Sequence, residues 1–314
     1  MHRKGVMDEI TFKYLSAKRD LKPGRLYLLP KLHKLDPELI ESVQQNPTLY
    51  KNVRIQGRPI VSLSGTVLER IGQYLDKFML PAVVKQETHL RDSLEFINII
   101  EKLQKISSLY RFRDDGFFIY NEGTDDEIAQ FFEHANRQHA LLKFTHEKSQ
   151  TKMQFLDVLV FKGPRFRETG ILDLTTFRKK TENYQYLERS SCHPSSTFRG
   201  IIKGEMLRFK RCTNDPVDLQ TQYALFSERL IKRGYPKNEI KTVMQEVTAK
   251  QRKDTLMVKP KSVLMSPPLV FSTVFSRQKS HIKTNILKHW DQLKDDEEAK
   301  LLFDKRPLFA FRRH

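Results

Sequence analysis

Two adjacent carboxylates are the side chains in this 314-residue chain whose spacing best suits chemistry. Asp114 and Asp115 lie in the run from Leu109 to Tyr120, with Gly116 directly after them and aromatic and β-branched residues on both sides. Strand formers around an Asp-Asp-Gly turn predict a β-hairpin over residues 111–120, with both acids at its turn. Such a pair can hold the divalent metal that clamps two oxygens of a phosphoryl transfer. An ordinary surface turn is the alternative, because Asp-Gly is common turn chemistry.

The charge of the chain indicates a polyanionic partner. Lys and Arg total 56 against 38 Asp and Glu, which gives a net charge of +18, and nucleic acid is the first candidate for a basic excess of this size. No run approaches the ~18 apolar residues of a membrane-spanning helix. The first residues also lack the apolar stretch of a secretory signal, so we expect an intracellular protein, nuclear or cytoplasmic, with no membrane partner and no small-molecule cofactor.

The two cysteines do not predict a metal site. Cys192 and Cys212 have only His193 near them in the sequence, which is too few residues for a four-ligand zinc site. We expect ordinary thiols, either buried or on the surface.

Two segments near the N-terminus look like short basic strands, at residues 26–34 and 57–62. Pro59 favours an edge strand or the start of a strand. Lys31, Lys34 and Arg58 are candidates to hold template phosphates or an incoming triphosphate, since a guanidinium fork matches phosphate oxygens. Solvated surface charges are the alternative.

Apolar spacing predicts the elements around these segments. Residues from Leu68 to Phe78 recur at helical spacing, and Pro81 should stop that helix; a second helix is expected over residues 91–106. Acids at 125–127 open a third helix, where they suit the helix dipole. The runs 153–161 and 170–177 look like strands, so the order β-β-α-β-β predicts an α+β fold, with an antiparallel sheet covered by helices on one face.

The segment from residue 178 to residue 211 is both basic and aromatic. Interleaved cations and rings can follow a phosphate backbone while bases stack on the rings. Alternatively, many of these rings face a protein core. The candidate nucleic-acid contacts in this segment are Arg178, Lys179, Lys180, Arg199 and Arg208.

The clearest helices come next. Asp215 followed by Pro216 predicts a capped helix start, an apolar stripe runs from Leu219 to Leu230, and Gly234 closes the helix. A second helix starts after Pro236, with apolar residues to 247. A helix, a glycine-containing turn and a helix on a basic chain are typical of a helix-turn-helix unit, and nearly as typical of any small helical bundle.

Taken in order, these blocks resemble the reverse transcriptases of Penelope-like retroelements. The region from 301 to 313 adds a less specific likeness, and residues 195–250 are similar to the helix-turn-helix region that follows the palm in the animal elements. The motifs that carry the resemblance are Leu29–Lys34, Gly57–Ser62, Phe112–Phe118, Phe144–Glu147, Phe155–Asp157, Phe177–Thr181 and Ser190–Pro194.

The resemblance implies a right-hand polymerase with fingers, palm and thumb, which copies RNA into DNA with two Mg²⁺ ions. RNA and DNA would be its partners. Asp114 and Asp115 match the acids of the family's palm hairpin, and Arg58 matches its fingers arginine. The chain would then consist of a fingers-like region at 1–106, a palm remnant at 107–180, a thumb and helix-turn-helix region at 181–250, and a basic C-terminal region at 251–314.

One interval departs from the family pattern. The family has a strand with a further catalytic aspartate, then a helix and a Gly-rich substrate loop, before the Asp-Asp hairpin. Here only residues 85–108 fill that interval, with one predicted helix and no such strand, while Asp76 and Asp92 belong to helical patterns. We therefore expect a reverse-transcriptase-derived protein that is catalytically incomplete. The alternatives are a non-enzymatic helix-turn-helix protein that binds nucleic acid, and an active polymerase whose missing acid is supplied differently.

Overall fold

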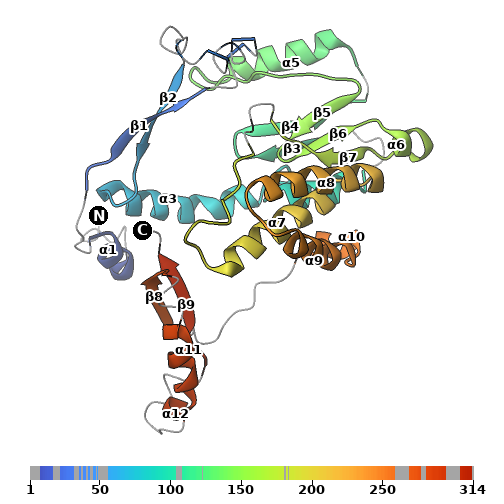
Figure 1. The fold of residues 1–314 in the computed structure, drawn as a ribbon. Coiled ribbons are helices and arrows are strands. Elements are labelled where there is room, and N and C mark those ends of the chain that lie inside the picture. Colours follow the sequence, from blue (N-terminus) through green and yellow to red (C-terminus); the bar gives the residue numbers. More distant parts are fainter. Residues whose placement is uncertain are drawn as a thin grey trace. The chain divides into compact units, whose positions relative to one another are not determined.

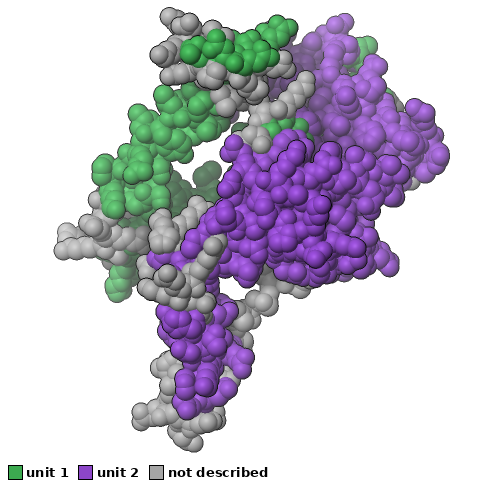
Figure 2. All heavy atoms as spheres, in the orientation of Figure 1, with its two compact units in different colours: residues 1–92, 106–124, 178–183 green, residues 93–105, 125–177, 184–314 purple. Residues whose placement is uncertain are grey.

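The structure is a computed structural model in which helices and small sheets alternate along the chain (Figure 1). The chain divides into two compact units (Figure 2): the first comprises residues 1–92, 106–124 and 178–183, and the second residues 93–105, 125–177 and 184–314. No helix in the described ranges combines the length and the hydrophobicity needed to cross a membrane. The structure describes residues 8–16, 22–31, 35–36, 38–39, 42, 45–46, 48, 56–103, 108–121, 123–179, 182, 184–258, 269–276, 281–294 and 305–312.

The first unit begins with a helix and a two-stranded sheet. Helix α1 (Glu9–Ser16) is followed by strands β1 (Arg25–Pro30) and β2 (Gly57–Ser62), which pair antiparallel. Helix α3 (Val67–Val84) comes next, and its N-cap Thr66 accepts a hydrogen bond from the backbone N–H of Leu68 at 3.2 Å. A threonine hydroxyl in this position satisfies one of the donors that a helix start leaves open.

Helix α3 runs past Pro81 to Val84, so the predicted stop at Pro81 is wrong. Proline has no backbone N–H to donate to the carbonyl of residue 77. Pro81 lies in the last turn of α3, so only a few helical residues follow the lost hydrogen bond. The apolar stripe predicted for this helix is largely exposed in the structure: Leu68 is 48%, Ile71 43%, Leu75 49% and Phe78 74% accessible.

The second unit begins with helix α4 (Ser93–Ile100), which is shorter than the helix predicted over residues 91–106. Residues 101–102 form a turn, and residues 104–107 lie outside the described part of the chain. Phe96 and Ile100 are fully buried, and the Phe96 ring meets Phe155 edge-on with centroids 4.8 Å apart. Helix α5 (Asp125–Arg137) starts at the predicted acids.

Strands β5 (Lys152–Phe155), β6 (Val158–Phe161) and β7 (Asp173–Thr176) form an antiparallel sheet in that order. The single strand predicted over residues 153–161 is wrong, because the chain reverses at Leu156 and Asp157, where Leu156 has φ +55°. A continuous strand would place Phe155 and Val158 on opposite faces, whereas the reversal pairs them and buries both. The short helix α6 (Pro164–Thr169) lies between β6 and β7 in the chain.

The last described elements include the chain's single tryptophan. Strands β8 (Val270–Val274) and β9 (Leu308–Arg312) pair in parallel, and helices α11 (His281–Lys288) and α12 (Trp290–Lys294) lie between them in the sequence. The Trp290 side chain is 1% exposed and meets the Phe271 ring at 6.3 Å, with the ring planes at 81°. Phe271 in turn stacks on Phe309 with centroids 5.5 Å apart.

Candidate nucleic-acid interface and the Asp-Asp hairpin

The hairpin predicted around the two acids is confirmed. Strand β3 (Ser108–Phe112) pairs antiparallel with β4 (Asp115–Ile119), and Tyr110 lies opposite Phe117. Phe117 is buried, and Phe112 and Ile119 are half-buried on the same face of the hairpin. A sheet face for these apolar side chains is what their alternation required.

The turn itself is displaced from the predicted Asp-Asp-Gly position. Arg113 and Asp114 form it, and Arg113 takes the left-handed conformation with φ +56°. Asp115 is the first residue of β4, opposite Phe112, and Gly116 is a strand residue opposite Arg111. When a two-residue turn moves by one residue, each residue's partner on the other strand shifts by two positions. Every side chain then stays on the same face of the hairpin. The apolar pattern therefore cannot distinguish the predicted turn position from the observed one.

The described residues do not complete a two-metal site. Asp114 and Asp115 are both exposed, and in the part of the chain that the structure describes no group of three or more His, Cys, Asp and Glu side chains gathers to hold a metal ion. Between residues 85 and 103 there is one helix, α4, and an isolated bridge from His89 to Arg111, but no strand that carries an aspartate. Asp92 directly precedes α4 and pairs with Arg91 at 3.6 Å.

The candidate cations of the first unit lie at two places. Lys31 follows β1, where its backbone N–H donates to the Gln56 carbonyl at 2.8 Å, and Arg58 lies on β2 opposite Leu29, so both belong to one hairpin. Arg178 pairs with Glu182 at 2.6 Å, and Lys179 is exposed. Lys34 and Lys180 lie outside the described residues.

Arg199 and Arg208 both belong to helix α7 (Ser195–Cys212) and both form ion pairs. Arg199 pairs with Glu246. Arg208 donates to Asp157 at 3.2 Å and to Glu205 at 3.4 Å. Their contribution to nucleic-acid binding stays a prediction, and the structure gives each a role inside the second unit.

Helix α7 was not recognised in the sequence, although it carries a clear signal. Phe198, Ile202, Met206 and Phe209 recur at helical spacing and are all fully buried. The many cations between them favoured an interpretation as a phosphate-binding segment. The two core phenylalanines, and Tyr184 beneath the Arg229 guanidinium at 3.4 Å, support the alternative that these rings serve packing.

The two helices predicted after α7 are confirmed. Helix α8 (Pro216–Lys232) begins at Asp215, whose carboxylate accepts from the backbone N–H of Asp218 at 3.0 Å. Gly234 adopts φ +81° in the turn, and α9 (Lys237–Thr248) follows Pro236. One buried cluster joins the three helices; besides the α7 residues it contains Tyr223, Phe226, Leu230, Tyr235, Ile240, Val243 and Val247.

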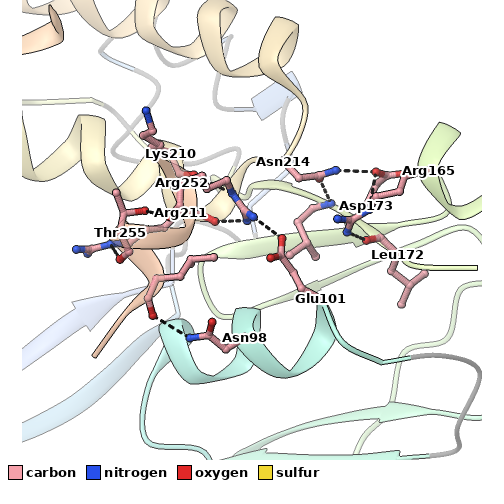
Figure 3. Close-up of polar contacts among 12 residues, drawn as sticks. Asn98, Glu101, Arg165, Leu172, Asp173, Lys210, Arg211, Asn214, Arg252 and Thr255 are labelled. Atoms are coloured by element: carbon pink, nitrogen blue, oxygen red, sulfur yellow. Dashed lines mark hydrogen bonds and ion pairs between the residues drawn. The ribbon is translucent and has the colours of Figure 1, made fainter. Parts of the chain in front are cut away.

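Cationic side chains bind the ends of these helices (Figure 3). Arg252, in the short helix α10 (Arg252–Leu256), donates to the carbonyls of Lys210 at 3.0 Å and Arg211 at 2.6 Å, and pairs with Glu101 at 2.5 Å. Lys210 donates to the carbonyls of residues 247 and 248 at the end of α9, and burial lowers its pKa below the ordinary value. Backbone carbonyls that a helix end leaves open thereby gain donors.

Asn214, just after α7, links the helices to the β5–β7 sheet. Asn214 donates to the Asp173 carboxylate at 2.7 Å, and its own side-chain oxygen accepts from the backbone N–H of Leu174 (Figure 3).

Cys212, at the end of α7, is a buried free thiol whose pKa burial raises to about 11, so it is inert as a nucleophile. Cys192 is an exposed free thiol.

One face of α9 is polar and open to solvent. A polar face on the second helix is the surface that a helix-turn-helix unit presents to nucleic acid. The exposed residues on it are Lys237, Asn238, Lys241, Thr242 and Gln245.

The three packed helices, with a glycine turn between α8 and α9, define a helix-turn-helix unit. Residues 185–245 match the family model described as the animal helix-turn-helix domain. Comparison with curated proteins and with solved structures found no match. Residues 185–245 therefore form a helix-turn-helix domain, and a domain of this kind suggests nucleic-acid binding.

Proposed function

We propose that this chain is a nucleic-acid-binding protein derived from the reverse transcriptase of a Penelope-like retroelement, with an incomplete palm. The observation that carries the proposal is the helix-turn-helix unit with the exposed polar face of α9, on a chain of net charge +18. Such a charge attracts RNA and DNA alike, because both present a phosphate backbone.

The geometry of α9 supports a role in binding. Lys237 and Lys241 are exposed one helical turn apart, and neither forms an ion pair with any residue that the structure describes. Between and beside them lie amide and hydroxyl side chains, which can donate to phosphate oxygens or base edges. Cations free of internal partners are the ones available to a ligand.

The order of motifs supports the origin in a reverse transcriptase. The Asp-Asp hairpin is followed by α5 and then by the β5–β7 sheet, and the helix-turn-helix unit comes after them, in the order expected for a right-hand palm followed by a thumb. The parent family would use two Mg²⁺ ions. The carboxylates described here do not fit a complete site of that kind, so we propose binding without DNA synthesis.

A binding measurement tests the proposal. We expect the double variant Lys237→Ala and Lys241→Ala to bind labelled RNA and DNA about tenfold more weakly, with a salt dependence reduced by about one ion for each lysine that contacts phosphate. Fluorescence anisotropy with several unrelated sequences would measure affinity and sequence preference, which we expect to be small.

Lys250→Ala with Lys253→Ala is the matched control, since it removes the same charge from exposed positions beyond the end of α9. The control should bind nearly as well as the unaltered protein. Equal losses in both double variants would show that α9 has no particular role, and an absence of binding at low salt would refute the proposal itself.

A further inference from the structure

A pocket of about 640 Å³ opens where the turn before α9 meets the segment before α7. The end of α8 contributes Lys232 to the pocket wall, the turn contributes Arg233 and Gly234, and the segment before α7 contributes residues 188–190. Three of the lining residues are cations, including Arg189, and one is the acid Glu188. This composition suits an anion better than an apolar ligand.

The wall of this pocket is held in place before any ligand arrives. The backbone N–H of Arg189 donates to the Arg233 carbonyl at 3.0 Å. The buried Tyr235 donates its hydroxyl to the Leu187 carbonyl at 2.9 Å. Gly234 has φ +81°, a conformation that side-chain-bearing residues rarely adopt. The backbone of the pocket wall therefore loses little conformational entropy when a ligand binds.

The three cations differ in how free they are. The Arg189 guanidinium lies over the Phe198 ring at 4.5 Å and pairs with Glu239 at 3.3 Å, so its place is set by the protein. Arg233 pairs with Glu188 at 3.1 Å, but the Glu188 side chain is 61% exposed and that of Arg233 30%. Lys232 is exposed, without an ion pair to any described residue.

The ion pair between Arg233 and Glu188 is open to water on the Glu188 side, and screening by that water limits its contribution to stability. Arg233 can therefore exchange the carboxylate of Glu188 for a phosphate at small cost. A guanidinium fork matches two phosphate oxygens, and an ammonium adds a compact charge beside it.

We infer that this pocket binds a phosphate of the nucleic-acid backbone, through Lys232 and Arg233, with Glu188 as the group that the phosphate displaces. The inference rests on the proposed function and assigns a contact beyond α9 itself. Residues 232–234 precede the N-terminal end of α9 by a few residues, so the inferred phosphate contact lies near the start of that helix in the chain.

Substitutions of opposite sign test the inference. Lys232→Ala with Arg233→Ala should weaken nucleic-acid binding about tenfold and reduce the salt dependence by one to two ions. Glu188→Gln should strengthen binding a few-fold, because it releases Arg233 and removes a charge that repels phosphate. Far-UV circular dichroism of each variant would confirm that it folds.

The Lys250→Ala and Lys253→Ala variant again serves as the control of equal charge. If the unaltered protein binds no nucleic acid, the proposed function fails. If it binds, but the pocket variant matches the control and Glu188→Gln does not strengthen binding, the proposed function stands and the pocket assignment is wrong. Saturable binding of inorganic phosphate alone, lost in the pocket variant, would reassign the pocket to a free anion and overturn the backbone assignment.

Discussion

Asp114 and Asp115 are neighbours in the sequence with different structural settings. Asp114 belongs to the turn, and Asp115 is a strand residue on the face of the hairpin that carries Phe117. Both carboxylates are exposed. Their position at one end of a hairpin is compatible with the palm of a polymerase. Among the described residues, however, they do not belong to any group of three or more His, Cys, Asp and Glu side chains that could hold a metal ion.

We expect the purified protein to extend no primer on an RNA template with Mg²⁺. Two-metal catalysis needs carboxylates on both sides of the ions, and positioning of the substrate supplies a large part of the rate. Gel-based primer extension measures this directly. Asp114→Ala should leave nucleic-acid affinity nearly unchanged. DNA synthesis that is lost in Asp114→Ala would instead favour an active polymerase whose remaining acid comes from elsewhere.

At the scale of elements, the helix-turn-helix unit is held by cations that bind helix ends. Arg252 serves two carbonyls at the end of α7 and the carboxylate of Glu101, while Lys210 serves the end of α9. Arg211 adds a hydrogen bond to the Thr255 carbonyl at 2.9 Å. Polar contacts thereby join the helices to α10 and to the residue that follows α4, in addition to their apolar core.

We expect Arg252→Ala to lower the free energy of unfolding by about 1–3 kcal/mol, because it leaves partly buried acceptors without their donor. Urea denaturation followed by far-UV circular dichroism would measure the change. The neighbouring Lys253 is exposed, so Lys253→Ala should alter stability by about 0.5 kcal/mol or less. Equal stability of the two variants would mean that the Arg252 contacts contribute little.

Local signals predicted some elements of this chain well. The Asp215 cap, the stripe from Leu219 to Leu230 and the Gly234 turn all lie between residues 215 and 234. Each signal predicts the same helices, so α8 and α9 follow from the sequence. Consistent local preferences of this kind leave few alternatives.

Other elements could not be deduced locally. The reversal at Leu156 requires a non-glycine residue at positive φ, which sequence patterns rarely indicate. The sequence predicts Arg199 and Arg208 of α7 as ligand contacts, whereas Arg199 pairs with Glu246 and Arg208 with Asp157, and both partners are distant in the sequence. The pocket beside Arg233 is also formed by segments about forty residues apart in the sequence, so no local sequence motif predicts it.

At the scale of the whole molecule, the excess of positive charge is the dominant property. The net charge is +18 over 314 residues, and ion pairs such as Arg199–Glu246 and Arg208–Asp157 are neutral overall, so the excess comes from cations outside such pairs. The remaining cations are available to recruit counterions or a polyanion. Binding by such a surface depends on the release of ions from nucleic acid.

We therefore expect the affinity of the unaltered chain for RNA and DNA to fall steeply with salt. For six or more phosphate contacts, the loss between about 50 and 200 mM salt is on the order of a thousandfold. A series of anisotropy titrations at increasing salt gives the slope of log affinity against log salt. A flat slope would point to recognition that does not depend on the basic surface.

The packing of Trp290 determines what an optical experiment on this protein will report. It is the chain's single tryptophan, and it is buried against Phe271 beside strands β8 and β9. Intrinsic emission excited selectively from tryptophan therefore follows the segment from β8 to β9 alone. The helix-turn-helix unit contains no tryptophan and does not contribute to this emission. An unfolding transition seen by tryptophan emission therefore need not coincide with the loss of helical ellipticity.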